Sequence, residues 1–348
     1  MKCYGCFKLI ATGTYCTKCK NELFNGRNIH QLNFDKKEFY EYRQSQASRI
    51  SISGVQDKIS LTLEGNYLVP TVTKGTYILK PVPATQLHHS EDIVANEHLS
   101  MQLSKQIFKI PTAANAIVHF RNGEMAYLVK RFDYAKDGNK LDQEDFASIL
   151  EMSEETHGQN YKYDSSYEAI AQAIQAVVAA SPMAIEDLYV RIIVNYLIGN
   201  GDAHLKNFSL YRPEGRSDYT LTPNYDLLYT GYHIHETVGV MGLELFDTYE
   251  TKSYGAFGSY SLEDFEVFAH QCKIPPPRLK KIFARIFASF GHVEQMIEHS
   301  FMTDKGKEDY WENFQKRLKN GLAYTIEQSG YAFDSVAKPL ADDFLKKV

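Results

Sequence analysis

One apolar segment, residues 185–198, is long enough for a buried helix, and a Gly-Asn-Gly tripeptide at 199–201 follows it. Glycine and asparagine tolerate the positive φ of a tight turn, so we expect the helix to end there. Polar residues fill positions 202–207, and residues 208–211 then alternate like a strand. A buried helix, a polar turn and a strand in this order predict that the chemistry of the protein lies in the turn.

The spacing of two residues in this turn predicts their roles. Asp202 and Asn207 are five positions apart, which is the D-x-x-x-x-N spacing of a kinase catalytic loop. In that loop the Asp accepts the proton of the substrate hydroxyl and the Asn holds magnesium. A second acid, Asp226, ends a predicted strand that begins at Leu221, where kinases place their main metal carboxylate. The turn alone could equally be a polar surface turn, but the second acid favours phosphoryl transfer.

Length and charge restrict the classes of protein to consider. A chain of 348 residues can bury a large core and is expected to form two domains or lobes. The net charge of −5 offers no electrostatic reason to bind nucleic acid or an anionic membrane. No apolar run approaches the ~20 residues of a membrane span, and the chain does not begin with a signal-peptide pattern. We therefore expect a cytoplasmic protein that makes no direct contact with nucleic acid or membrane.

The cysteines fall into a group of four, in the pattern C-x2-C-x9-C-x2-C, and a lone Cys272 that is expected in the core. In a reducing compartment the four are unsuited to disulfides, and four thiolates suit tetrahedral zinc. Gly5 and Gly13 allow the backbone to turn between them, although reduced thiols in a small hairpin are the alternative. With no other ligand nearby, the zinc site would be closed and structural. The predicted ligands are Cys3, Cys6, Cys16 and Cys19.

The order of the predicted elements divides the chain into three parts. Residues 1–24 form the cysteine module, 25–132 a strand-rich part with a linker, and 133–348 a mostly helical part. Strands are predicted at 59–63, 67–69, 76–80, 117–120 and 125–131. Helices are predicted at 36–44, 90–108 (with Ser90 as N-cap), 165–180 (with a Ser165-x-x-Glu168 capping box), 185–198, 261–272, 277–299 and 307–319, with a rigid break at Pro275–Pro277. The predicted fold class is therefore α+β, a two-lobed kinase-like fold with a small strand-rich lobe before a larger helical lobe.

Phosphoryl transfer needs cations and N–H groups around the phosphates, and candidates for these groups occur along the chain in the expected order. Lys80 would reach the α- and β-phosphates, and Glu97, which lies among apolar neighbours on its helix, would orient it; the alternative is an exposed Lys and a surface Glu. Lys206 would neutralise charge on the moving phosphoryl group, and His204 would hold the loop together. The connection between the lobes, where main-chain groups can meet adenine, is Val129-Lys130-Arg131, and Phe132 directly after it is also a nucleotide-binding candidate. A loop that could lay N–H groups over the phosphates, or be a plain turn, consists of Ser51, Ile52, Ser53, Gly54, Val55, Gln56, Asp57 and Lys58.

Taken together, these residues resemble the HipA-type serine/threonine kinases of bacterial toxin–antitoxin systems. The resemblance covers about residues 45–320, in the segments Ser51–Lys58, Tyr77–Pro81, Asn96–Glu97, Val129–Asp133, Leu197–Phe208 and Pro223–Asp226. It implies ATP and magnesium as cofactors, with Asp202 as the base and Asn207 and Asp226 on the metal. It also implies inhibitory autophosphorylation on Ser51 or Ser53. The protein substrates of the family include aminoacyl-tRNA synthetases.

The sequence also departs from this family in informative ways. HipA carries an N-terminal subdomain of about a hundred residues where this sequence has the cysteine module and a linker, and in this and in Ser51-Ile52-Ser53 it is more similar to the short HipT form. The resemblance to HipT implies two partners, a small HipS-like protein and a DNA-binding HipB-like antitoxin. The Arg that precedes the catalytic Asp in eukaryotic kinases and a Gly after Asp226 are absent, so the usual activation-loop regulation is not expected.

Three functions are compatible with these residues. The leading prediction is a protein kinase toxin. A small-molecule phosphotransferase would share the spacing of Asp202 and Asn207, but it gives no reason for the serine-containing loop. An inactive nucleotide-binding adaptor in a repressor complex would need no catalytic base, so the complete set of site residues argues against it.

Overall fold

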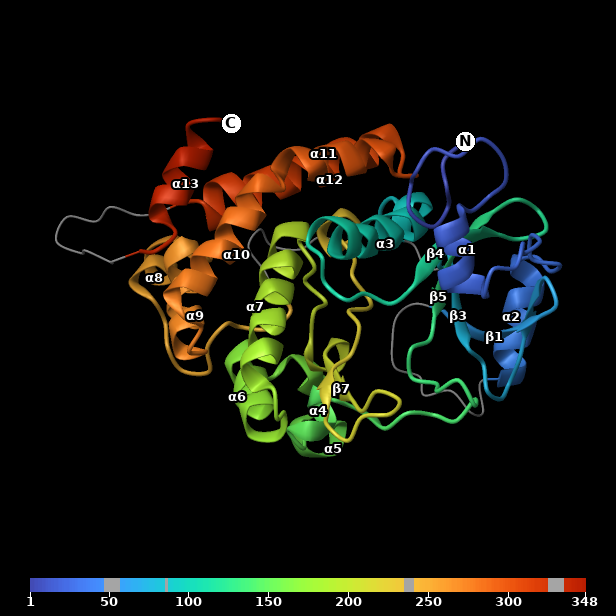
Figure 1. Cartoon of the computed structure of the whole chain (residues 1–348), viewed down its shortest axis with the longest axis horizontal. Helices are drawn as coiled ribbons and strands as arrows, with labels where there is room; N and C mark the ends of the chain where they lie inside the picture. The colour runs from blue at the N-terminus through green and yellow to red at the C-terminus, as the bar shows by residue number, and fades with distance from the viewer. Residues whose placement is uncertain (47–56, 85–86, 235–240, 325–334) are drawn as a thin grey trace.

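The computed structural model describes residues 1–46, 57–84, 87–234, 241–324 and 335–348. The predicted phosphate-loop residues 51–56 lie outside these described residues. A five-stranded sheet lies at one end of the molecule and most helices at the other, with α3 (Ile93–Gln102) between them (Figure 1). In the ranges just given, no helix is long and apolar enough to cross a membrane.

The sheet is antiparallel throughout, in the order β2-β1-β3-β5-β4. Its first two strands form the hairpin predicted around Gly65, whose φ of 58° is readily adopted by glycine. Leu61 and Leu79 are fully buried in a core that includes Phe24 of α1 (Thr17–Phe24). All predicted strands of this part are confirmed, and their bounds are β1 (Ile59–Glu64), β2 (Tyr67–Pro70), β3 (Tyr77–Pro81), β4 (Asn115–His119) and β5 (Met125–Lys130).

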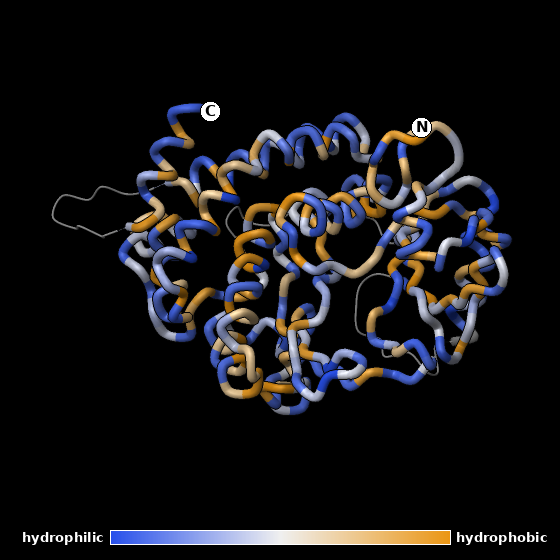
Figure 2. Tube along the Cα trace, viewed as in Figure 1, coloured by the Kyte–Doolittle hydropathy of each residue, from blue (hydrophilic) through white to orange (hydrophobic). Residues whose placement is uncertain are grey.

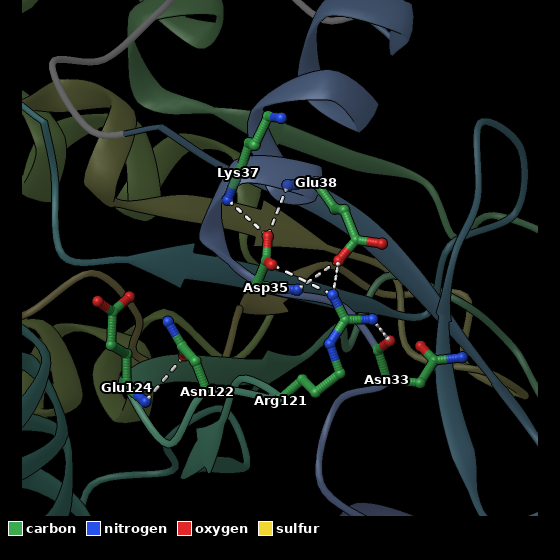
Figure 3. A network of polar contacts seen from close by, with 7 residues as sticks. All are labelled: Asn33, Asp35, Lys37, Glu38, Arg121, Asn122 and Glu124. Carbon is green, nitrogen blue, oxygen red and sulfur yellow. Dashed lines mark hydrogen bonds and ion pairs between the residues drawn. The ribbon is translucent and has the colours of Figure 1, made fainter.

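A polar network around Arg121 attaches α2 (Lys36–Gln46) to the sheet (Figure 3). The Arg121 guanidinium donates to the carbonyl oxygen of Asn33 at 2.9 Å and pairs with Glu38 at 2.6 Å. The first turn of α2 is capped by Asp35, whose Oδ1 accepts the main-chain N–H of Glu38 at 3.0 Å. Because the Arg121 side chain is 55% exposed, we expect the network to orient α2 more than to stabilise it.

Every residue of α3 is buried, and the helix packs on β4 and β5. A 3-10 turn, Ser90–Asp92, precedes it and a π-helical turn, Leu103–Ile107, follows it, so the helix predicted for 90–108 is confirmed. The sheet and the helical part enclose the helix, so its polar residues are buried together with its apolar ones: Asn96, Glu97, His98, Ser100 and Gln102. It is therefore the element that connects the two ends of the molecule.

The predicted N-cap of this helix is wrong. The capping position belongs to His89, whose φ is 47°, and no side chain caps the turn. The buried carboxylate of Asp92 instead accepts hydrogen bonds from the N–H of Thr303 at 2.7 Å and from its hydroxyl at 2.6 Å. It also accepts from Tyr232 at 3.0 Å. These bonds hold the start of α3 against the helical part.

The helical part is built around α7 (Ser181–Ile198), which packs on α6 and α12. Residues 188–198 of α7 are buried without interruption, whereas the outer α12 is largely hydrophilic (Figure 2). α7 ends as predicted at Gly199, whose φ of 78° lies in the left-handed region. The other helices are α4 (Phe146–Ile149), α5 (Glu154–His157), α6 (Tyr167–Val177), α8 (Lys252–Phe257), α9 (Leu262–Gln271), α10 (Pro276–Ala288), α11 (Phe290–His299), α12 (Asp304–Arg317) and α13 (Lys338–Leu345).

Two predicted helices differ in detail. The N-cap of α6 is Ser166, which accepts the N–H of Ala169 at 3.0 Å, so the predicted capping box at Ser165 is wrong by one position. The helix predicted for 277–299 is two helices that meet at Ser289, because the Ser289 hydroxyl donates to the carbonyl oxygen of Ile286 at 2.6 Å. The short helices α1, α4, α5, α8 and α13 were not predicted, since packing rather than propensity stabilises helices of this length.

A second, smaller sheet supports the polar turn that follows α7. It has the order β6-β7-β8, with β6 (Gln143–Asp145), β7 (Ser209–Tyr211) and β8 (Thr220–Leu221), and both pairs are antiparallel. The strand predicted at 208–211 is thus confirmed. Through β8 the same sheet leads the chain to Asp226.

The positive φ at the end of α7 leads to a stability prediction. Gly199→Ala would be strained at φ 78°, and its Cβ would lie 3.0 Å from Tyr229 Cδ2 and 3.1 Å from Asn313 Nδ2. We expect a loss of about 2 kcal/mol in the free energy of unfolding, measured by urea titration. Gly291→Ala is the control, because that glycine has an ordinary helical φ and its Cβ would meet nothing within 4 Å. The control should gain about 0.5 kcal/mol or more; equal stability of both variants would contradict the assigned turn.

Candidate active site

An ion cluster joins the sheet, α3 and the chain after β8. The ammonium of Lys80, on β3, lies 2.7 Å from Glu97 Oε1 on α3 and also bonds Asp226 Oδ1. Lys80 and Glu97 are buried, whereas the side chain of Asp226 is half-exposed. The structure therefore brings together three of the residues that the sequence indicated separately.

The protonation states in this cluster follow from burial and from the shared charge. Burial works against a charged Lys80, yet Asp226 and Glu97 together raise the pKa of its ammonium, so the lysine stays positive. Burial raises the pKa of Glu97 to about 7, against the opposing effect of Lys80. Desolvation opposes ionisation of Asp226, but the neighbouring ammonium of Lys80 holds the pKa of this carboxyl below its usual value. Asp226, the exposed carboxylate of the cluster, is thus the residue best able to bind a cation.

The backbone at Asp226 is strained. Its φ is 60°, in the left-handed region that residues with a Cβ seldom adopt. Neighbouring hydrogen bonds hold it there: the N–H of Asn224 donates to Pro111 O at 2.7 Å, and Tyr225 donates to Lys206 O at 2.9 Å. Strain of this kind costs about 1–3 kcal/mol and gathers at functional sites.

The loop after α7 is held by hydrogen bonds to its own main chain. The Asn200 side chain donates to Asn195 Oδ1 at 2.8 Å and accepts the N–H of Asp202 at 3.2 Å. Thr230 accepts the N–H of Gly201 at 2.9 Å. These bonds leave the Asp202 carboxylate half-exposed at the surface of the loop.

The side chains of Tyr163 and His204 lie beside Asp202, the predicted base. Tyr163 donates its hydroxyl hydrogen to Asp202 Oδ1, and His204 Nε2 lies 3.8 Å from the same oxygen. The rings of Tyr163 and His204 are in edge-to-face contact with centroids 5.1 Å apart. Burial lowers the pKa of His204, so the imidazole is neutral and contributes packing and orientation rather than charge.

Lys206 and Asn207 lie on a 3-10 turn, Leu205–Asn207, that follows the base. The Lys206 ammonium is 3.4 Å from Asp145 Oδ2 on β6; although partial burial opposes its charge, Asp145 raises the pKa of this lysine. Asn207 is buried, and within the described residues its Nδ2 has no hydrogen-bond partner. An amide with such an uncommitted end can turn its oxygen towards a cation. Amide and carboxylate oxygens are ligands that magnesium accepts, so Asn207 and Asp226 fit a magnesium site.

Of the predicted phosphate loop, the structure describes Asp57 and Lys58. Lys58 is partly buried, and burial followed by the like charge of Lys80 lowers the pKa of its ammonium. The charges that act on it, those of Lys80, Asp226, Glu97 and Lys206, are the charges of the cluster itself. Lys58 therefore belongs to the same site.

The predicted connection between the lobes makes contacts of its own with the sheet and with the cysteine module. Lys130 turns towards the cysteine module, with Nζ 3.0 Å from Glu22 O, and Arg131 pairs with Asp133 through Nε at 2.9 Å. The main-chain N–H groups of Lys130 and Arg131 donate to Ala114 O and Thr76 O, so neither is directed at a ligand. Phe132 packs near Tyr225, with ring centroids 5.7 Å apart, which places it beside the residue that precedes Asp226. The pairing of β5, which ends at Lys130 and so one residue before the predicted end, engages these main-chain groups.

Sequence reasoning missed two residues that shape the site. Tyr163 was not singled out because it belongs to a polar loop without periodicity. Gly242 lies against the main chain of Ala203, and a Cβ there would come within 2.5 Å of its N, C and O atoms. A close approach of this type leaves no signal in a single sequence, since only the fold brings positions 203 and 242 together.

The four cysteines predicted to bind metal also come together. Their Sγ atoms all lie within 4.8 Å of one another, and they form the one group of potential metal ligands found in the part of the chain that the structure describes. Cys272 is buried in the core, as expected.

The HipA-like C-terminal domain family matches residues 50–293, which is more than half of the chain. The chain belongs to this family. A Haemophilus influenzae protein with the name "Putative kinase" is 28% identical to this HipA-like chain over 303 residues, covering 83% of this chain and 86% of the relative. The Sinorhizobium fredii protein "Putative kinase Y4dM" is 30% identical over 200 residues, 53% of this chain and 46% of its own length.

Solved structures agree with the HipA-like fold. The HipA of Shewanella oneidensis, determined with HipB and operator DNA, superposes with a TM-score of 0.56 at 20% identity, covering 86% of this chain and 67% of that one. The Helicobacter pylori proinflammatory kinase CtkA gives a TM-score of 0.51 at 13% identity and covers 81% of this chain and 94% of that one. The predicted α+β class is thus confirmed as a kinase-like HipA fold with a strand sheet and a helical part.

Proposed function

We propose that this HipA-like protein is an ATP- and magnesium-dependent serine/threonine protein kinase. The observation that carries the proposal is the position of Lys80, which bonds both Glu97 of α3 and Asp226 beside the Asp202–Asn207 loop. A lysine held by two carboxylates from different parts of the chain is pre-organised for phosphate, since a nucleotide phosphate can replace Asp226 as its partner. We also propose that the chain forms two lobes. Residues 25–132 would bind the nucleotide, and residues 133–348 would bind the acceptor.

Each residue then has a defined task. Asp202 accepts the proton of the acceptor hydroxyl, whose oxygen attacks the γ-phosphorus while the bond to the ADP oxygen breaks. Lys80 and Lys58 bind phosphate oxygens, and Lys206 stabilises the charge that develops on the transferred group. Asp226 and Asn207 would hold magnesium, which neutralises phosphate charge when it is bound. Asp145 keeps Lys206 on the loop, 3.4 Å away, in the absence of nucleotide.

The biological setting that we propose is a toxin–antitoxin system. Support comes from membership of the family, from the structural likeness to a HipA determined with HipB and operator DNA, and from the resemblance to HipT in residues 51–53. A HipB-like antitoxin would bind the DNA, since the net charge of −5 offers this chain no electrostatic reason to do so, and a small HipS-like protein is the second partner. The proposed substrate is a translation component such as an aminoacyl-tRNA synthetase. Phosphoproteomics after brief expression, compared with Asp202→Asn, tests this assignment.

Replacing Asp226 and Asp202 one at a time separates nucleotide binding from phosphoryl transfer. Asp226→Asn should weaken the binding of magnesium-nucleotide, because it removes a carboxylate ligand. Asp202→Asn should leave nucleotide binding within about twofold of wild type and lower the transfer rate by about 10²–10⁴-fold. Isothermal titration with a non-hydrolysable nucleotide and assays with labelled ATP measure the two effects. Full transfer activity in Asp202→Asn would overturn the assignment of the base.

The hydroxyl of Tyr163 occupies the place that we assign to the acceptor, since it donates to the same Asp202 oxygen. Tyr163→Phe keeps the ring against His204 and frees that oxygen. A hydrogen bond to a charged group contributes about 1.5–3 kcal/mol, and Tyr163 is 37% exposed, so we expect less than this, about 0.7–1.4 kcal/mol. The variant should raise kcat/KM for a protein acceptor by about threefold to tenfold and leave the KM for ATP unchanged.

The exposed Tyr249 is the matched control, since Tyr249→Phe also removes a phenol hydroxyl but lies outside the site. It should leave all kinetic constants unchanged. A fall in kcat for Tyr163→Phe would instead make Tyr163 a residue that positions the base, and would refute its competition with the acceptor.

Autophosphorylation on Ser51 or Ser53 is the regulatory part of the proposal. Phosphate there adds nearly two negative charges, which Lys58, Lys80 or Lys206 would attract. Wild-type protein should carry added phosphate by intact mass, mapped to the peptide that spans both serines, and Asp202→Asn should carry none. Phosphate on the inactive variant would count against self-modification.

A further inference from the structure

The four clustered cysteines have the spacing of a metal site. Cys3 and Cys6 lie in a turn at the start of the chain, and Cys16 and Cys19 lie at the beginning of α1. The Sγ atoms of Cys6 and Cys16 are 3.8 Å apart. Tetrahedral zinc with bonds of about 2.3 Å separates its sulfurs by about 3.8 Å, whereas a disulfide requires about 2.05 Å.

The surroundings of the thiols favour thiolates. The main-chain N–H groups of Gly5 and Cys16 point at Cys3 Sγ, at 3.4 Å and 3.2 Å, which stabilises negative charge on the sulfur. Gly5 is required for this arrangement, because a Cβ there would lie 2.8 Å from Cys19 Sγ. A hairpin with protonated thiols would need neither two N–H donors to the sulfur of Cys3 nor a glycine that leaves room for the sulfur of Cys19.

The same turn is attached to the helix that carries Glu97. The ring of Phe7, next to Cys6, meets the ring of the buried His98 edge-on with centroids 4.8 Å apart. Gln106, in the π-helical turn after α3, donates to Cys6 O at 3.2 Å. Since His98 follows Glu97 directly, the contact to the cysteine turn and the carboxylate that holds Lys80 lie on adjacent residues of one buried helix.

The module also contacts the other elements that frame the active site. The hydroxyl of Tyr77, three residues before Lys80 on β3, donates to Leu23 O at 2.6 Å at the end of α1. Tyr4 accepts the N–H of Ile117 on β4 at 3.0 Å and meets the ring of Phe301 at 4.8 Å. Figure 1 shows the N-terminal module beside both α3 and the loop between α11 and α12. The module thus contacts the sheet, α3 and the helical part.

We propose that Cys3, Cys6, Cys16 and Cys19 bind one zinc ion, and that the zinc-loaded module holds α3 so that Glu97 reaches Lys80. A module of 24 residues is too small to be ordered by its own core, so the metal would supply its folding energy. Phe7 and the Cys6 carbonyl then form a fixed surface for His98 and Gln106. The zinc site is inferred from the geometry of the cysteines alone. The functional importance of the coupling to Glu97 rests on the proposed kinase function.

Metal analysis tests the first half. Protein purified without chelator should contain about one zinc per chain by mass spectrometry of the elements, and the double variant Cys3→Ser/Cys19→Ser should contain none. Cys272→Ala is the matched control, because it removes a buried thiol remote from the cluster and should keep one zinc. A wild-type protein without zinc, which also fails to take up added zinc, would overturn the metal site.

Hydrogen exchange tests the second half, on zinc-loaded and chelator-treated wild-type protein. Removing zinc should raise amide exchange in residues 93–107 by about tenfold or more and weaken magnesium-nucleotide binding by about tenfold. Gln106→Ala should keep the zinc and still raise exchange in the same peptide. The exposed Gln172 is the matched control, and Gln172→Ala should leave that exchange unchanged. The chelator experiment and Gln106→Ala remain decisive if the cysteine double variant fails to fold.

The outcomes separate this inference from the proposed function. Zinc content and exchange are measured without catalysis, so one zinc with coupled α3 exchange but no phosphoryl transfer would refute the kinase alone. An active kinase whose exchange in 93–107 and nucleotide affinity are the same with and without zinc would refute the coupling alone.

Discussion

The bond of Lys80 to Glu97 and Asp226 is the interaction on which the rest of the structure depends. Its partners come from the sheet, from α3 and from the chain after β8, so all three must be positioned before the charges can meet. A buried ion cluster pays a large desolvation cost and is weak as a stabiliser. Its geometry is set instead by the packing around it, which consists of the sheet on one side of α3 and the Asp92 hydrogen bonds on the other.

The loop after α7, which we propose to be catalytic, depends on a different constraint. The fully buried end of α7 fixes where the loop begins, and the positive φ of Gly199 turns the chain out of the helix. Asn200 and Thr230 then hold the main chain, while Gly242 admits the close approach of Ala203. The main chain of the loop is therefore fixed, while the Asp202 carboxylate is half-exposed. A rigid scaffold that presents a few exposed polar groups is the arrangement that phosphoryl transfer needs.

Several elements could be predicted because their signals are local. The strands of the first sheet, the helix at 185–198 and the turn after it follow from alternation, apolar length and glycine. The errors are also local in origin. Ser165 and Ser166 are equally good caps by residue type, and packing of the helix decided for Ser166. The bond from the Lys130 side chain to Glu22 O of the cysteine module, by contrast, has no local signal in the sequence.

The sequence by itself determined which groups were candidates for the site, because the spacing from Asp202 to Asn207, the one basic residue on β3 and the acid at 226 are covalent facts of the chain. It likewise determined that four thiols lie close enough in the chain to share one metal. The tertiary structure alone decided that Tyr163 bonds the base, that Gly242 supports the loop, and that the cysteine module is attached to the helix of Glu97. The reason is physical: these contacts join residues 39 to 100 positions apart, and only the packing of the whole fold brings such residues together.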